Sequence, residues 1–179
     1  MKAKNEQTRV MGRYSVAQRL NNYALTFACR GGSDVEAVKL ALEQGADPNW
    51  ALGMTLPPLH SVVRYCEPGD HRRIAKSLDI IKLLVDAKVQ IDGRDCNGCT
   101  ALYLALDMGV LPFVEALIAA GASVENLDGE GNDIAAVIAD GGEKGIGARY
   151  GDIYHYVEEN YPDRLLEAWV VDGTRQEVG

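Results

Sequence analysis

The feature that most constrains this sequence is a 33-residue unit, residues 95–127, which has copies on both sides of it. The unit opens with the turn signal Asp-Cys-Asn-Gly at 95–98. It continues into a short apolar helix over 100–106, breaks at 108–109, and forms a second helix over 113–118 that ends at Gly121. A helix pair this small cannot bury its apolar face alone, so the repetition predicts a stack of such pairs, a solenoid.

The copies align on the residue that ends each second helix. Gly45 corresponds to Gly121, and Lys88 takes the same place 33 residues before Gly121. A helix often ends in a left-handed residue, which glycine adopts without steric cost. Thr55 and Thr100 are expected to cap the first helices of the second and third copies. A degenerate fourth copy begins at Asp128.

These motifs resemble the ankyrin repeat, whose pattern is Asp-x-x-Gly-x-Thr-Pro-Leu-His-x-Ala, then an apolar helix, then Gly-Ala-Asp. Residues 95–127 match best, with Ala101 in place of proline and Tyr103 in place of histidine. Thr-x-x-Pro-Leu-His at 55–60 and Gly-Ala-Asp at 45–47 match in the neighbouring copies. The resemblance implies an all-α ankyrin-repeat solenoid of about four repeats, over about 24–50, 51–94, 95–127 and 128–161. It also implies that His60 has a structural hydrogen-bonding role.

The two ends of the chain have different compositions. Residues 1–12 are polar and are expected to form a disordered tail before a repeat domain over 13–161. A helix is predicted after Ser15, with Gln18 as its capping-box partner. Its apolar face, formed by Val16, Leu20, Tyr23 and Leu25, is expected to cap the open end of the stack. Residues 162–179 are predicted to be a C-terminal capping helix and tail, because Leu165, Leu166, Trp169 and Val170 recur at helical spacing.

Two insertions interrupt the joint between the helices of a pair. Residues 66–77 lengthen the second repeat and residues 141–151 the fourth, so both inserted loops should emerge from one edge of the solenoid. The first carries the densest basic cluster of the chain: His71, Arg72, Arg73 and Lys76.

Composition indicates a single domain in a reducing compartment. Four cysteines without a secretory signal suggest free thiols, and no apolar run reaches membrane-spanning length. We therefore expect a cytoplasmic protein, or one delivered to the cytoplasm.

Charge is unevenly distributed along the chain. Residues 1–30 hold six basic side chains and one acidic, whereas residues 31–179 hold 12 basic and 25 acidic side chains, a net charge of −13. This acidic body favours a basic partner and argues against direct nucleic-acid binding through the body. A solvated surface is the plainer interpretation of the same charge.

Two motifs suggest chemistry. Cys96 and Cys99 form a C-x-x-C, but a structural zinc needs four ligands and there is no second C-x-x-C. The glycine-rich segment 141–151 suggests a phosphate loop, but such a loop follows a strand, and here a helix is predicted before it. A small enzyme or ligand sensor that uses either motif is the alternative function.

The favoured function is a non-enzymatic protein-interaction module without a cofactor or metal. It would bind one partner through hairpin tips and the concave face, as an adaptor or as an inhibitor of immunity or counter-defence type. Trp50 has two open interpretations: it folds over a neighbouring turn, or it is an exposed anchor. The predicted partner-binding residues are Trp50, Arg64, Tyr65, Arg94, Tyr103, Asp107 and Met108.

Overall fold

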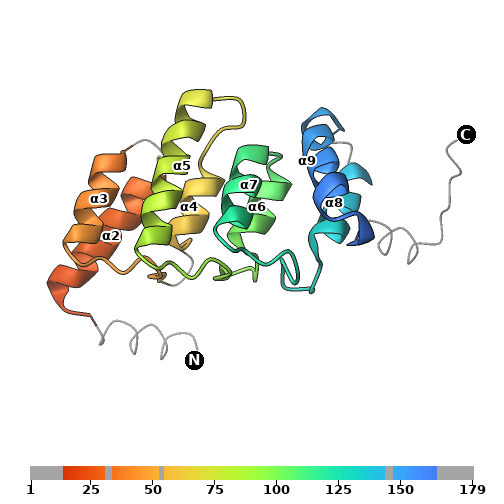
Figure 1. Ribbon diagram of the computed structural model, residues 1–179. Helices are drawn as coiled ribbons and strands as arrows, with labels where there is room; N and C mark the ends of the chain where they lie inside the picture. Colours follow the sequence, from red (N-terminus) through yellow and green to blue (C-terminus); the bar gives the residue numbers. More distant parts are fainter. Residues whose placement is uncertain (1–13, 31–33, 53–54, 144–146, 165–179) are drawn as a thin grey trace, which may run out of the picture.

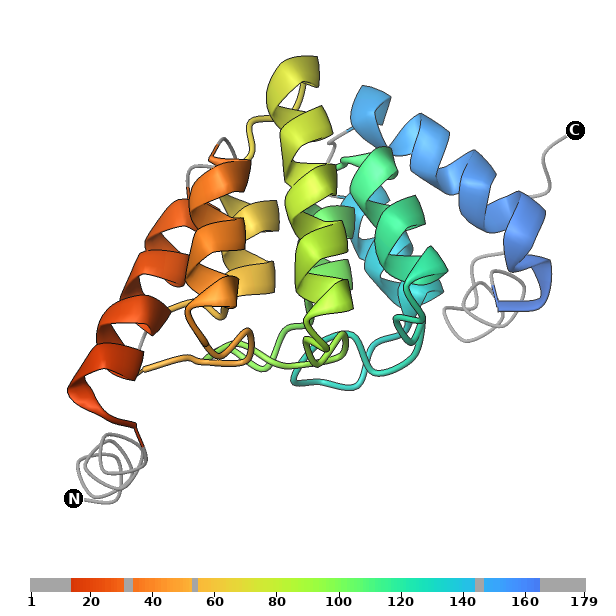
Figure 2. The ribbon, with the colours of Figure 1, turned by 60° about the vertical axis from the view of Figure 1, so that its left-hand side comes forward.

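The computed structural model describes residues 14–30, 34–52, 55–143 and 147–164. These residues form four helix pairs stacked side by side (Figures 1 and 2). The predicted tail at 1–12 and most of the predicted C-terminal capping helix lie outside the described residues. The helices are α2 (Val16–Arg30), α3 (Val35–Glu43), α4 (Pro58–Arg64), α5 (His71–Asp86), α6 (Ala101–Asp107), α7 (Leu111–Ala119), α8 (Ile134–Glu143) and α9 (Gly147–Asn160).

The pairs build two layers. The first helices α2, α4, α6 and α8 pack on one another, and the second helices α3, α5 and α7 do the same. Each first helix also packs on the second helix of its own pair. The core between the layers contains fully buried side chains such as Leu59, Ile80, Leu102 and Phe113. Among the described residues there is no strand, so the predicted all-α fold class is confirmed.

The helix ends follow the predicted chemistry. Gly45 and Gly121 have φ values of 81° and 93°, and Lys88 takes the same left-handed conformation at 64°. Thr100 caps α6 by accepting a hydrogen bond from the Tyr103 amide at 3.2 Å. Thr55 does not cap α4: that helix begins after Pro57, and the Thr55 hydroxyl bonds to Leu52 instead.

The long connections between pairs lie along one edge of the stack (Figure 1). Each is held to the next by a side chain that accepts a backbone hydrogen bond. Asn49 accepts from the Gln90 amide at 2.6 Å, and Asp92 accepts from the Ser123 amide at 2.8 Å. These hydrogen bonds join each connection to the next and so fix the spacing of the helix pairs.

The predicted N-terminal cap and the first helix of the first repeat are one continuous helix. The capping box at Ser15 and Gln18 is present, with reciprocal hydrogen bonds of 3.1 and 3.3 Å. Only Leu25 of the predicted capping face is buried, however. Val16, Leu20 and Tyr23 are exposed, so the prediction that they cover the open end is wrong. Their helical spacing was recognised, but they lie on the side of α2 opposite its packed face.

Most of the described residues of the two insertions are helical, and residues 66–70 form a turn before α5. Residues 71–77 lengthen α5 to 16 residues, against nine in α3 and α7. Asp70 caps the extension by accepting from the Arg73 amide at 3.0 Å. As a result α5 projects beyond its neighbours (Figure 2), and its first two turns carry the basic cluster. In the second insertion α8 runs to Glu143 and α9 starts at Gly147.

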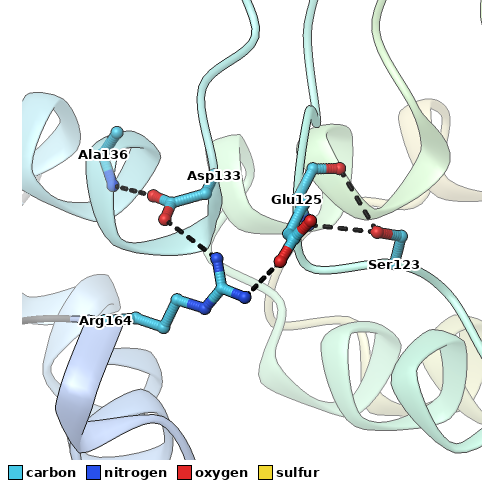
Figure 3. Close-up of polar contacts among 5 residues, drawn as sticks. All are labelled: Ser123, Glu125, Asp133, Ala136 and Arg164. Carbon is cyan, nitrogen blue, oxygen red and sulfur yellow. Dashed lines mark hydrogen bonds and ion pairs between the residues drawn. The ribbon is translucent and has the colours of Figure 1, made fainter.

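The last pair is tied to the connection that precedes it. Arg164, just after α9, forms ion pairs with Glu125 and, at 3.7 Å, with Asp133 (Figure 3). Asp133 also caps α8, because it accepts a hydrogen bond from the Ala136 amide at 2.9 Å. This bridge places the start of the C-terminal segment against the fourth pair.

Candidate protein-interaction surface

The predicted binding residues separate into two groups. Trp50 and Arg94 lie in the connections along one edge of the stack. Arg64, Tyr65, Asp107 and Met108 lie at the opposite ends of first helices, as the final and capping residues of α4 and α6. Tyr103, half-buried, lies near the start of α6, between these two edges.

Trp50 is not an exposed anchor. Its side chain is 3% exposed and packs edge-on against Tyr23 of α2, with ring centroids 4.7 Å apart. The backbone turns at this point, because the Trp50 amide donates to the Asp47 carbonyl at 3.1 Å. Of the two interpretations left open by the sequence, the structure therefore supports folding over a neighbouring element.

Arg94 is on the surface, but its guanidinium serves the fold. Nη1 donates to the carbonyls of Gly98 and Asp128, the latter at 2.7 Å, and Nη2 donates to the carbonyl of Asn126. One planar fork thus joins the turn of the third pair to the connection before the fourth. A carbonyl row of this kind suits arginine, whose donors are fixed in one plane.

We expect Arg94→Met to lower the free energy of unfolding by about 1–3 kcal/mol, because three carbonyls lose a charged donor. Arg94→Lys should recover only part of the loss, since a single ammonium cannot reproduce the fork. Urea denaturation followed by circular dichroism measures both values. Arg72→Met, at an exposed arginine of α5, is the matched control. An equal loss in the control would show that arginine removal, not the carbonyl clamp, lowers stability.

The other residues define what we call the first-helix face, the outer side of the α2, α4 and α6 layer. Along one edge of this face Arg30, the last residue of α2, lies over the ring of Tyr65, with 4.7 Å from Cζ to the ring centroid. The same guanidinium donates to the Tyr65 hydroxyl at 2.9 Å. Each group therefore holds the other in place while Tyr65 remains 40% exposed.

A pocket opens beside this pair, between α2 and α4. Two hydroxyls in its wall are already engaged: Thr26 donates to the Asn22 carbonyl at 3.0 Å, and Ser61 donates to the Leu56 carbonyl at 3.3 Å. These internal hydrogen bonds fix the conformation of both side chains in the pocket wall. The residues that line the pocket are Thr26, Arg30, Thr55, Leu56, Ser61 and Tyr65.

Arg30 was missed by the sequence analysis, although a signal existed. It is the last residue of α2, as Arg64 is of α4 and Asp107 is of α6. Stacked equivalent helices place equivalent positions in a row. Once Arg64 and Asp107 are selected, this periodicity selects Arg30 as well.

The C-x-x-C turn is complete without a metal ion. The Asp95 carboxylate accepts from the amides of Asn97 and Cys99, both at 2.9 Å, and Gly98 takes a φ of 82°. The same turn recurs 33 residues later, where Asp128 accepts from three amides. Burial, followed by the nearby Asp95 and Asp128 charges, raises the pKa of the Cys99 thiol. A raised pKa disfavours the thiolate that nucleophiles and metal ligands require.

We expect the Cys96→Ser and Cys99→Ser double variant to keep the circular dichroism spectrum and the melting temperature of the native chain. The reason is that backbone and carboxylate hydrogen bonds hold this turn. Metal analysis of the purified native chain is the companion measurement. One equivalent of bound zinc would overturn this interpretation.

The histidines have distinct environments. His60 is 1% exposed, and its Nε2 lies 3.0 Å from the Cys99 carbonyl of the next pair. This geometry confirms the structural hydrogen-bonding role that the resemblance implied, and burial lowers the pKa of His60. His155 is exposed on α9, next to Glu158. Among the described residues, no group of three His, Cys, Asp or Glu side chains could hold a metal ion.

The glycine-rich segment 141–151 is shared between the end of α8 and the start of α9. Because α8, a helix, leads into it, the described residues lack the strand that a phosphate loop follows. None of the helices in the described ranges is long and apolar enough to cross a membrane.

Comparison with known proteins supports the repeat assignment. The ankyrin repeat family model matches residues 97–129. Over 100 residues, 56% of its length, the chain is 30% identical to an ankyrin repeat and KH domain-containing protein from Caenorhabditis briggsae. The chain spans about 4% of the length of that relative.

Proposed function

Because this chain is an ankyrin-repeat protein, we propose that it is a non-enzymatic binding module that recognises one protein partner through its first-helix face. Ankyrin repeats generally serve protein–protein interaction. A rigid stack presents its surface in the binding conformation, which lowers the entropic cost of association. The proposal needs no cofactor.

The observation that carries the proposal is the Arg30–Tyr65 pair beside its pocket. Tyrosine and arginine are the side chains most often found at energetic centres of interfaces. Here the two restrain each other, so less side-chain freedom is lost when a partner binds. Arg64, Asp107 and Met108 extend the same edge, and Tyr103 lies deeper on α6. The predicted anchors Trp50 and Arg94 are not part of this proposal.

The charge distribution supports a partner with a basic surface. The net charge of −13 over residues 31–179 would steer such a partner toward the stack. The chain would then act as an adaptor, or as a cytoplasmic inhibitor of immunity or counter-defence type that blocks its partner. The alternative, a small enzyme or ligand sensor, is less favoured because Cys99 is a weakly acidic thiol and the glycine-rich segment joins two helices.

The test begins with capture of the partner from native cell extract and its identification by mass spectrometry. We then expect Tyr65→Ala to weaken binding by about 2 kcal/mol, roughly 30-fold, because truncating a central aromatic anchor has this effect. Isothermal titration calorimetry gives the affinity, and circular dichroism verifies folding.

Two further variants locate the surface. Lys82→Ala changes an exposed side chain of α5, in the second-helix layer, and should bind like the native chain. Arg72→Ala probes the basic first turn of α5. Normal binding by Tyr65→Ala together with weak binding by Arg72→Ala would refute the first-helix face and favour the projecting end of α5.

A further inference from the structure

An apolar stripe on α2 is left largely uncovered by the stack, although the ring of its third residue, Tyr23, packs edge-on against Trp50. Val16, Leu20, Tyr23 and Phe27 are 64%, 64%, 45% and 78% exposed. Their spacings of four, three and four residues place all four side chains on one side of the helix. Single exposed apolar side chains are common, but a continuous stripe marks an interaction surface.

The stripe faces away from the packed side of α2. Asn21 donates to the Gln44 carbonyl at 2.8 Å, and Asn22 accepts from the Asp47 amide at 2.7 Å, so these residues face the end of α3. Leu25 and Cys29, on the same side, are fully buried. The four stripe residues occupy the opposite side, which α2 presents at one end of the stack (Figure 1).

We propose that the stripe binds the same stripe of a second copy of this chain, with the two α2 helices antiparallel. A four-three-four spacing is the a/d pattern by which two helices pack along a seam. With the two-fold axis between residues 21 and 22, Leu20 faces Tyr23 of the second copy and Val16 faces Phe27 of the second copy. Each layer thus pairs a larger side chain with a smaller one.

The flanking residues fit the antiparallel arrangement. On one side Ala17 faces Ala24 of the second copy, and both alanines are exposed and small enough for close approach of the helices. In a parallel pair each seam residue would face its own counterpart, so Val16 would meet Val16 and Phe27 would meet Phe27, and the match of larger with smaller side chains would be lost.

The contact is small, so the dimer is weak. Four half-exposed side chains from each copy bury on the order of 1,000 Å² in total, at the lower limit of specific interfaces. We therefore expect a monomer–dimer equilibrium with a Kd of roughly 10 µM to 1 mM, the range of small, transient contacts. Binding at the first-helix face is a separate property and is not required for this dimer.

Sedimentation equilibrium of the full chain over that concentration range tests the proposal. The native chain should dimerise, and Val16→Glu or Phe27→Lys should each raise Kd at least tenfold. Leu40→Glu is the matched control, because Leu40 is also 54% exposed but lies on α3. Circular dichroism verifies folding of every variant. A native chain that stays monomeric at about 1 mM, or a control that dissociates as much as Val16→Glu, would overturn the proposal.

A mixture of the two variants tests the orientation. In an antiparallel heterodimer Glu at position 16 meets Lys at position 27, while the second layer keeps its native Phe27 and Val16 pair. Equimolar Val16→Glu and Phe27→Lys should therefore associate at least tenfold more tightly than either variant alone. A parallel dimer would join Glu to valine and lysine to phenylalanine, so absence of rescue would overturn the antiparallel arrangement.

Discussion

Leu102→Asp is expected to unfold this chain or to lower its free energy of unfolding by at least about 4 kcal/mol. Leu102 is 1% exposed in α6, and α6 packs against α4, α7 and α8. The change removes a buried apolar side chain and leaves a carboxylate without a partner, and each effect alone costs about 2–5 kcal/mol. A domain of this size has only about 5–15 kcal/mol of stability in total.

Thermal and urea denaturation measure this effect, and Leu102→Met is its control. Methionine keeps the volume and the apolar character, so it should cost less than about 1.5 kcal/mol. A melting temperature of Leu102→Asp equal to that of the native chain would mean that position 102 does not face the core. The alignment of the other repeats would then be wrong as well, because the core positions of α4 and α8 are the ones that align with Leu102.

The fold was predictable because every copy of the repeat forms the same helix pair, so one well-matched copy predicts the others. Gly45, Lys88 and Gly121 all end second helices in the left-handed conformation, as their alignment predicted. What the repeat does not govern was predicted less well. The sequence 71–77 departs from the pattern and was expected to be a loop, yet Asp70 caps it and Ile74 anchors it in the core as a helix. The repeat boundaries themselves stay a prediction.

The candidate site was less predictable, because residue type does not reveal which side chains the fold already uses. Arg94 and Arg30 look alike in the sequence. The guanidinium of Arg94 donates to one carbonyl of its own turn and to two of the neighbouring connection, whereas that of Arg30 lies on an open tyrosine ring beside a pocket. The two roles differ because the backbone of residues 126–128, distant in the sequence, passes next to Arg94 and provides two of its acceptors.

Trp50→Ala tests the difference between side chains that the fold uses and side chains that are left for binding. We expect this variant to lower the free energy of unfolding and to leave the affinity for the partner unchanged. Trp50 is 3% exposed and packs on Tyr23, so its removal leaves a large cavity between α2 and the first connection. Truncation of a buried tryptophan or phenylalanine to alanine typically costs about 3–5 kcal/mol. The measurement is urea denaturation, made alongside the affinity for the captured partner at a temperature where the variant is still folded.

Trp50→Phe and Tyr65→Ala complete the comparison. Phenylalanine keeps an aromatic ring against Tyr23, so Trp50→Phe should recover most of the lost stability. Tyr65→Ala should show the opposite pattern, because Tyr65 is 40% exposed and its ring packs against the exposed Arg30. It should unfold much like the native chain yet bind weakly. If folded Trp50→Ala loses the partner while its denaturation midpoint is unchanged, Trp50 is the exposed anchor after all. The edge formed by the connections, and not the first-helix face, then contains the binding site.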